Sequence, residues 1–299
     1  MTAAATPAPP APRDGVVQVT GELVANRRVG AYRHLTLTAP GVAQPARPGQ
    51  FVALAVGGPT SANLLRRCFS IHRVDPSEGT VDIVVAAHGP GTTWITELEP
   101  HAEVGIVGPL GRPFPLPTAP VACVLVGGGY GSAPLFWLAE QLTAKGCHVE
   151  MVLGAAGEDR LFGVAEARRA AHGVTITTDD GSTGTKGWVS DVLPEVIRLT
   201  DAAVVYACGP MAMLRSVTEV ATAEGAVAQV AVEEAMACGI GVCMTCVLPV
   251  TGVDGRTRMV RSCVEGPVFR GSSVRWDAFA DGYCVVPDDA VGSPTGTGH

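Results

Sequence analysis

The sequence predicts a multidomain β + α/β protein: an antiparallel β-barrel, a doubly wound parallel sheet and a small C-terminal cysteine-rich domain. Short β-type segments recur at regular spacing through residues 15–116, which is typical of a small barrel. Strand-type and helix-type segments alternate through residues 117–232, and this alternation indicates a parallel sheet. Closely spaced cysteines mark the loop-rich residues 233–285. Residues 1–14 and 286–299 are expected to be disordered tails.

The composition limits the functions that the chain can have. Its 299 residues are enough for two or three domains. The net charge of −7 and the lack of basic runs argue against nucleic-acid binding. Residues 120–139 carry no charge, but glycines and a proline interrupt them, so we expect a buried strand, a turn and a helix rather than a membrane span. Nine cysteines without a secretory signal favour metal ligation over disulfides and the cytoplasm as the default compartment.

The barrel strands are predicted from runs of β-type residues bounded by glycine, proline, aspartate and asparagine. These runs are VVQVTGELVA, YRHLTLTAP, QFVALAV, RCFSIHRV, TVDIVVAAH and AEVGIVGP. Several prolines between residues 113 and 120 then form a linker to the parallel sheet.

Two segments of the barrel carry groups that bind phosphate. Arg66, Arg67 and Ser70 are expected on one strand, with Arg66 and Ser70 on the same face. Arginine can fork onto a phosphate, and serine can donate to a phosphate or a flavin ring. A solvated edge strand is the alternative interpretation. The second segment, residues 88–93, is a glycine turn followed by two threonines, which would suit a diphosphate.

The parallel sheet is predicted from VACVLVGGG, HVEMVLGAA, VTITTDD and AAVVYACG, with helices between them. The glycine cluster Gly127–Gly131 lies between the first of these strands and a helix, where a helix N-terminus can face a pyrophosphate. It is not a complete G-x-G-x-x-G, so a nucleotide-binding turn and a merely tight turn both remain open. Residues 206–210 end a later strand at the same edge of the sheet and favour the nucleotide. The acidic residue expected about 20 positions after the turn is Glu150 or Glu158.

The cysteines have the most specific spacing in the chain. Cys238, Cys243 and Cys246 form C-x4-C-x2-C, and Cys263 follows after sixteen residues. This is the spacing of plant-type 2Fe–2S ligation. Zinc is the alternative, but zinc ribbons use paired C-x2-C knuckles. The segment is too short to bury a core of its own, so we expect the cluster to hold it together.

The order of barrel, dinucleotide sheet and iron–sulfur segment resembles the ferredoxin–NAD(P)+ reductase-like superfamily. Within it, the chain is most similar to the electron-transfer subunits of type B dihydroorotate dehydrogenases. The motifs that carry the resemblance run from about residue 16 to 271: PGQFV, LLRRCFSI, GPLG-x-x-F, GGGYGSAPL, TDDGSTGTKG, CGPMAML, ACGIGVCMTC and CVEGPVF.

The resemblance implies three cofactors. FAD would lie in the barrel along Arg67, Cys68, Phe69, Ser70, Val84, Val85 and Ala86, with its diphosphate at Gly91 and Thr92. NAD would lie over Gly127, Gly128, Gly129, Gly131, Cys208, Gly209 and Pro210. A 2Fe–2S cluster would be bound by Cys238, Cys243, Cys246 and Cys263. In two places the chain departs from the family pattern, because Cys68 replaces a proline and Val85-Ala86 replace a Tyr-Arg pair. Arg66 is a candidate to compensate for the lost arginine.

The resemblance also implies a function. An FMN-containing catalytic subunit would oxidise dihydroorotate, and electrons would pass through the 2Fe–2S cluster and FAD of this chain to NAD+ in pyrimidine biosynthesis. The family suggests a heterotetramer with two copies of each chain. The first alternative is an NAD(P)H-dependent reductase component of an oxygenase or hydrogenase system. The second is a regulatory subunit that uses its cluster as a redox switch.

Overall fold

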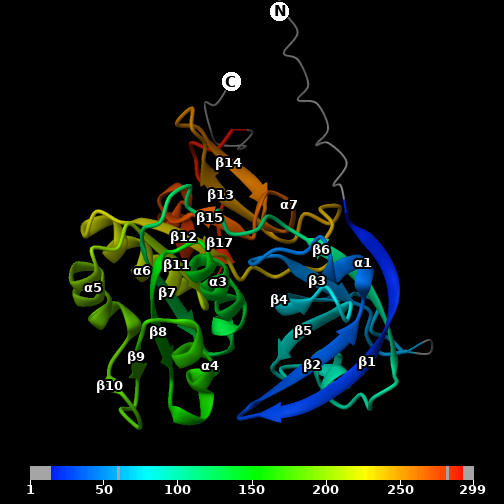
Figure 1. Cartoon of the computed structure of the whole chain (residues 1–299). Helices are drawn as coiled ribbons and strands as arrows, with labels where there is room; N and C mark the ends of the chain where they lie inside the picture. Colours follow the sequence, from blue (N-terminus) through cyan, green and yellow to red (C-terminus); the bar gives the residue numbers. More distant parts are fainter. Residues whose placement is uncertain (1–14, 59–60, 281–282, 292–299) are drawn as a thin grey trace, which may run out of the picture.

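The computed structural model describes residues 15–58, 61–280 and 283–291. The predicted tail at 1–14 and residues 292–299 of the second tail lie outside these ranges. Figure 1 shows the barrel beside the parallel sheet, with the cysteine-rich segment across one end of both. The predicted fold class, a barrel followed by a dinucleotide-type sheet and a small C-terminal part, is confirmed.

Every predicted barrel segment forms a strand. The strands are β1 (Val17–Val29), β2 (Tyr32–Thr38), β3 (Phe51–Leu54), β4 (Arg67–Asp75), β5 (Thr80–Val85) and β6 (Glu103–Leu110), with helices α1 (Pro40–Ala43) and α2 (Pro90–Thr96) between them. They close in the order β1-β2-β5-β4-β3-β6 with antiparallel pairing. Leu35, Ile71 and Ile83 are fully buried inside the barrel, because alternate side chains of each strand point inward.

The second sheet is parallel apart from one edge. Its strands lie in the order β10-β9-β8-β7-β11-β12-β15, and only the β12–β15 pair is antiparallel among the pairings described. The bounds are β7 (Ala122–Gly128), β8 (His148–Ala155), β9 (Gly173–Thr178), β10 (Thr185–Lys186), β11 (Val204–Cys208), β12 (Val227–Ala231) and β15 (Val268–Arg270).

Helices cover both faces of this sheet (Figure 1). They are α3 (Ala133–Ala144), α4 (Val164–Ala170), α5 (Val189–Thr200) and α6 (Met211–Ala223), with short 3-10 turns η1 (Gly129–Ser132) and η2 (Glu158–Arg160). Helix α5, which contains Pro194, was not predicted from the sequence. Its buried residues Val189, Leu193 and Ile197 recur every four positions, and this spacing is the signal that could have found it.

The cysteine-rich segment is tied to both neighbours. It contains β13 (Val247–Thr251), β14 (Thr257–Arg261), α7 (Ser262–Glu265), η3 (Gly271–Ser273), η4 (Trp276–Ala278), β16 (Phe279–Ala280) and β17 (Tyr283–Cys284). Its strand β15 joins the parallel sheet, and the Arg112 amide of the barrel segment donates to the Gly266 carbonyl. Residues 286–291, expected in the tail, lie against β14, where the Val291 amide donates to the Thr257 carbonyl.

The barrel and the sheet contact each other through polar groups. Arg73 of β4 pairs with Glu140 of α3 and Glu166 of α4 at 2.8 and 2.7 Å. His72 is buried, with Nδ1 2.6 Å from the Ala133 carbonyl oxygen at the start of α3. These contacts position the glycine turn before α3 against the barrel. Across the described ranges, no helix has the length and apolar character needed to span a membrane.

Candidate functional site

A cavity of about 390 Å³, here called the flavin-side cavity, opens between the barrel and the parallel sheet. Its walls come from β4, the end of β5, the glycine turn and the segment after β12. The lining residues are Phe51, Arg67, Cys68, Phe69, Ser70, Val84, Ala86, His88, Thr92, Tyr130, Gly131, Ala133, Pro134, Cys208, Ala231, Val232, Glu233, Glu234, Ala235, Met236 and Pro267. Most of the residues expected along FAD are therefore brought to one surface.

Arg67 and Gly91 form a close contact at one end of this cavity. A Cβ atom placed on Gly91 would lie 2.7 Å from Arg67 Nε, so a larger residue there would displace the guanidinium from its present position. Thr92 Oγ1 accepts hydrogen bonds from the amides of His88 and Gly89 at 2.9 and 3.0 Å, which holds the turn before α2. A guanidinium held over a glycine backbone is a group that can bind a phosphate oxygen.

Two neighbouring residues face elsewhere. Val85 is 1% exposed and packs into the barrel core. Arg66 precedes β4, and its Nη1 donates to the Gly105 carbonyl at 2.8 Å. The Arg66 guanidinium is therefore directed at the backbone of β6, while Arg67 lines the cavity.

A second cavity of about 740 Å³, here called the nucleotide-side cavity, lies at the carboxyl edge of the parallel sheet. It is lined by Tyr32, His88, Gly128, Gly129, Tyr130, Gly154, Ala155, Ala156, Arg160, Thr177, Asp179, Trp188, Val189, Ser190, Pro210, Ala212, Met213, Ser216 and Glu233. Ligands of open α/β sheets bind at this edge.

The glycines of the turn have different surroundings. Gly128 and Gly129 line the nucleotide-side cavity, whereas Gly131 lines the flavin-side cavity with Cys208. A Cβ atom on Gly131 would lie 2.8 Å from Gly209 Cα, so the turn packs directly on the backbone after β11. A Cβ atom on Gly127 would lie 2.5 Å from the Ser132 side chain. This glycine allows the tight turn and lines neither the flavin-side nor the nucleotide-side cavity as described.

The acidic residues of the nucleotide-side cavity are not those that the sequence spacing indicated. Glu150 lies in the first half of β8, where His148 Nε2 contacts its carboxylate at 2.9 Å, far along the strand from the glycine turn. Glu158 lies in η2 and does not line the cavity. The acidic residues that do line this cavity are Glu233, in the segment after β12, and Asp179, at the end of β9. The position of Asp179 two strands from the glycine turn is set by the β7–β8–β9 pairing and not by sequence spacing.

The four predicted cluster cysteines lie together beside the barrel. Cys246 and Cys263 are 2% and 0% exposed and pack against Phe51, Ala53 and Leu110. Cys238 is half-buried, and Cys243 is exposed. The loop thus joins the hydrophobic surface of the barrel on one side and presents Cys243 to solvent on the other.

Glycines and backbone hydrogen bonds shape the cysteine loop. Gly239 and Gly241 have φ of +71° and +87°, and residues other than glycine rarely adopt these backbone angles. Arg261 Nη1 donates to the Gly241 carbonyl at 3.1 Å, and the Ser262 hydroxyl donates to the Cys246 carbonyl at 2.9 Å. The loop is therefore held from the β14–α7 side.

The thiols interact as two pairs. Hydrogen bonds from Thr245, followed by one with Cys238, lower the pKa of Cys243 to about 6. Burial, followed by a hydrogen bond with Cys246, raises the pKa of Cys263 to about 12. Within the described residues, no three His, Cys, Asp or Glu side chains converge as they would around one metal ion. A 2Fe–2S cluster takes two cysteines on each iron, so the pairs Cys238/Cys243 and Cys246/Cys263 fit it better than a single zinc.

Cys68 lies between the cysteine loop and the flavin-side cavity. It lines that cavity, and its Sγ atom is 3.0 Å from the position of a Cβ atom on Gly239. It also lies 4.0 Å from the Met236 carbonyl oxygen. Phe51 also lines the cavity and lies beside Gly239, so the side chains of Cys68 and Phe51 stand between the cavity and the loop.

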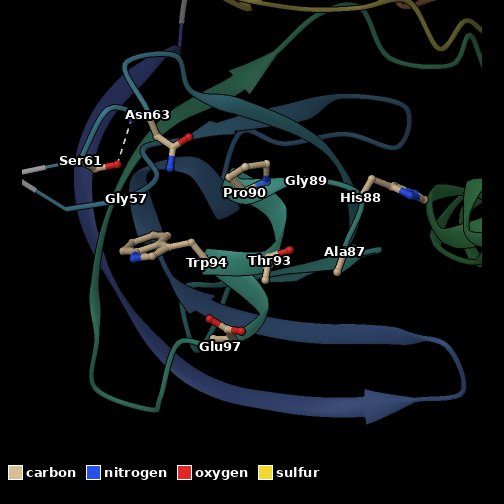
Figure 2. A pocket seen from close by; sticks show the side chains of 10 residues that line it. All are labelled: Gly57, Ser61, Asn63, Ala87, His88, Gly89, Pro90, Thr93, Trp94 and Glu97. Atoms are coloured by element: carbon tan, nitrogen blue, oxygen red, sulfur yellow. Dashed lines mark hydrogen bonds between the residues drawn. The ribbon is translucent and has the colours of Figure 1, made fainter.

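A third cavity of about 750 Å³ lies beside α2 (Figure 2). It is lined by Gly57, Ser61, Asn63, Ala87, His88, Gly89, Pro90, Thr93, Trp94 and Glu97. Figure 2 shows Trp94 and Asn63 facing the same space. The backbone N–H of Asn63 donates a hydrogen bond to Ser61 Oγ at 3.0 Å. His88 lines this cavity as well as the other two.

Two family models match parts of the chain. Residues 233–275 match the iron–sulfur cluster binding domain of dihydroorotate dehydrogenase B. Residues 125–219 match the oxidoreductase NAD-binding domain. The matched segments coincide with the cysteine loop and with the sheet that carries the nucleotide-side cavity.

Similar solved structures support the fold. The NADH-dependent reduced ferredoxin–NADP oxidoreductase is 30% identical, with a TM-score of 0.76 over 86% of this chain and 90% of that chain. A ferredoxin NADP+ reductase from Neisseria gonorrhoeae has a TM-score of 0.58 at 14% identity, over 70% of this chain and 92% of that one, and shows the fold alone.

Curated relatives match this chain over most of its length and over nearly all of their own. The dihydroorotate dehydrogenase B (NAD(+)) electron transfer subunit of Geobacillus thermodenitrificans is 40% identical over 88% of this chain and 98% of its own length. The subunit of the same name from Desulforamulus reducens is 34% identical over 82% of this chain and 92% of its own. The chain therefore belongs to the family of dihydroorotate dehydrogenase B electron transfer subunits.

Proposed function

We propose that this chain carries electrons from an FMN-containing dihydroorotate dehydrogenase subunit to NAD+, through a 2Fe–2S cluster and FAD. One observation carries the proposal: the cysteine loop, the flavin-side cavity and the nucleotide-side cavity adjoin one another in that order. The comparisons favour this function over a reductase of an oxygenase or hydrogenase system. When bound, FAD would exchange single electrons with the cluster and electron pairs with the nicotinamide.

The proposed FAD-binding domain spans residues 15–116. Its flavin would lie along Arg67, Cys68, Phe69 and Ser70, which line one wall of the flavin-side cavity with Val84 and Ala86. Arg67 over Gly91, beside Thr92, is the proposed diphosphate site. The cavity beside α2 shares His88 with this site and offers the indole of Trp94, so we place the adenosine half of FAD there.

The proposed NAD-binding domain spans residues 117–232. Gly128, Gly129 and Pro210 line the nucleotide-side cavity, while Gly131 and Cys208 lie where the nicotinamide would meet the flavin. Asp179 can accept hydrogen bonds from the ribose hydroxyls and would repel the 2′-phosphate of NADP. Gly127 and Gly209 support the turn through the close backbone contacts that they allow.

The proposed cluster domain spans residues 233–285, with Cys238, Cys243, Cys246 and Cys263 as ligands. The side chains around Cys243 are apolar and exposed: Ile240, Val242 and Met244 are 50%, 73% and 52% exposed. Such a patch beside a redox group is suited to burial against another protein. We therefore place the catalytic subunit over this loop. The proposed complex has two copies of each chain, which is what the family resemblance implies.

Reconstitution of the purified chain tests the function. We expect it to bind FAD, two irons and NADH, and to pass electrons from NADH to artificial acceptors. It should not oxidise dihydroorotate alone, because in this proposal that reaction takes place at the FMN of the catalytic subunit. A colourless preparation that holds zinc in place of iron would contradict the proposal.

A further inference from the structure

The flavin-side and nucleotide-side cavities meet at three residues, His88, Tyr130 and Glu233, which line both. The Tyr130 hydroxyl donates a 2.9 Å hydrogen bond to the Glu233 carboxylate. This bond joins the glycine turn after β7 to the segment that follows β12. The phenol ring and the carboxylate thus stand at the boundary between the two cavities.

The position of this pair matters because the two cofactors must touch. If FAD and NAD bind as proposed above, on which this inference rests, electron-pair transfer needs reacting atoms about 3–3.5 Å apart. A side-chain pair at the boundary occupies space in which that contact has to be made. One partner must therefore move before the nicotinamide can reach its reacting position.

Tyr130 is placed so that its side chain can move while its backbone stays fixed. The backbone is held on one side, where Gly131 packs on Gly209 with no room for a Cβ atom. The ring is half-buried and has aromatic neighbours, with centroids 5.5 Å from Tyr32 and 5.9 Å from His88. Glu233 is exposed, so its carboxylate can be hydrated once the bond breaks.

We propose that the Tyr130–Glu233 hydrogen bond is a gate between the flavin and the nicotinamide. With the bond made, Tyr130 stands between the cavities, with its ring beside Tyr32 and His88. With the bond broken, the ring is free to turn away from the boundary and the nicotinamide enters. Binding of NAD+ then includes the free energy of breaking the bond, so the measured affinity is lower than that of a chain whose gate is always open.

The test is the affinity of the full chain, loaded with FAD and its cluster, for NAD+, followed by flavin absorbance. Tyr130→Phe keeps the ring and removes the bond, so the dissociation constant should fall about two- to fivefold. Glu233→Ala removes the acceptor of the same bond, so it should lower the dissociation constant for NAD+ by a similar factor. In the double variant the gain should not add, because each change removes the same bond.

Tyr206→Phe is the matched control, because the Tyr206 hydroxyl bonds the Pro115 carbonyl at 2.7 Å and lines neither cavity. Its affinity for NAD+ should equal that of the unaltered chain. Unchanged or weaker binding in Tyr130→Phe, or full additivity in the double variant, would overturn the gate. Failure of the unaltered chain to bind FAD or NAD+ would overturn the cavity assignments themselves, and the gate with them.

Discussion

At the scale of single residues, Asp179 is the acidic group that we expect to select the nucleotide. It lines the nucleotide-side cavity, whereas its neighbour Asp180 accepts hydrogen bonds from the Ser182 amide and hydroxyl at 2.9 and 2.7 Å. Asp179→Asn should raise the ratio of NADPH to NADH activity about tenfold, because the charge that repels the 2′-phosphate is gone. Steady-state kinetics with both nucleotides measure this ratio. Asp180→Asn is the control, and an equal rise in both variants would refute the assignment.

A second prediction at the scale of single residues concerns Trp94 and its contribution to FAD binding. Its indole faces the cavity in which we place the adenosine of FAD. Trp94→Ala should weaken FAD binding by about 1–3 kcal/mol, the range measured for a base stacked on an aromatic side chain. Trp94→Phe should retain most of the affinity because it keeps an aromatic face. Equal FAD affinity in the alanine variant and the unaltered chain, measured by equilibrium dialysis, would exclude adenosine from this cavity.

These residues show where sequence reasoning succeeds for a site. Cys238, Cys243 and Cys246 and the glycine turn are local motifs, so their spacing alone predicts that each set lies together. Asp179 and Glu233 reach the cavities through strand pairing and through the segment after β12, which no spacing in the chain encodes. Cys208 was expected near the nicotinamide, and it lines the flavin-side cavity.

At the scale of elements, the cysteine loop can be tested apart from the nucleotide sites. Cys243 is exposed, so Cys243→Ser should remove a cluster ligand without opening the core that surrounds Cys246 and Cys263. We expect loss of the iron–sulfur absorbance and of electron transfer to the partner, with NADH reduction of FAD largely intact. Cys284→Ser is the control, because Cys284 lies outside the proposed ligand set. Loss of NADH–FAD exchange in Cys243→Ser would show that the loop also serves that step.

The strands and helices were predictable where their pattern is regular. The barrel strands and β7, β8, β9 and β11 follow the β-type runs of the sequence. The edge strand β15 was not foreseen, because its three residues, Val268–Arg270, are too short to show a period. Its pairing with β12 makes the cysteine-rich segment part of the larger sheet. A small domain without a full core gains stability in this way, beyond what the cluster supplies.

At the scale of the whole molecule, the apolar patch formed by Ile240, Val242 and Met244 predicts how the partner docks. Val242→Asp should weaken the complex with the catalytic subunit at least tenfold, since a charge would be buried in an apolar contact. NADH oxidation with artificial acceptors should not change. Val253→Asp is the control, because Val253 is fully exposed in the turn between β13 and β14. Analytical ultracentrifugation of the mixed subunits measures both variants, and equal binding would place the interface elsewhere.

The central claim, that this chain conducts electrons between a partner's flavin and NAD+, is tested most directly by anaerobic mixing with dihydroorotate. The flavin and iron–sulfur absorbance is followed for the chain alone and for its complex with the catalytic subunit. We predict bleaching by dihydroorotate only in the complex, and bleaching by NADH in both. Reduction of the isolated chain by dihydroorotate, or no reduction of its cofactors in the complex, would contradict the claim.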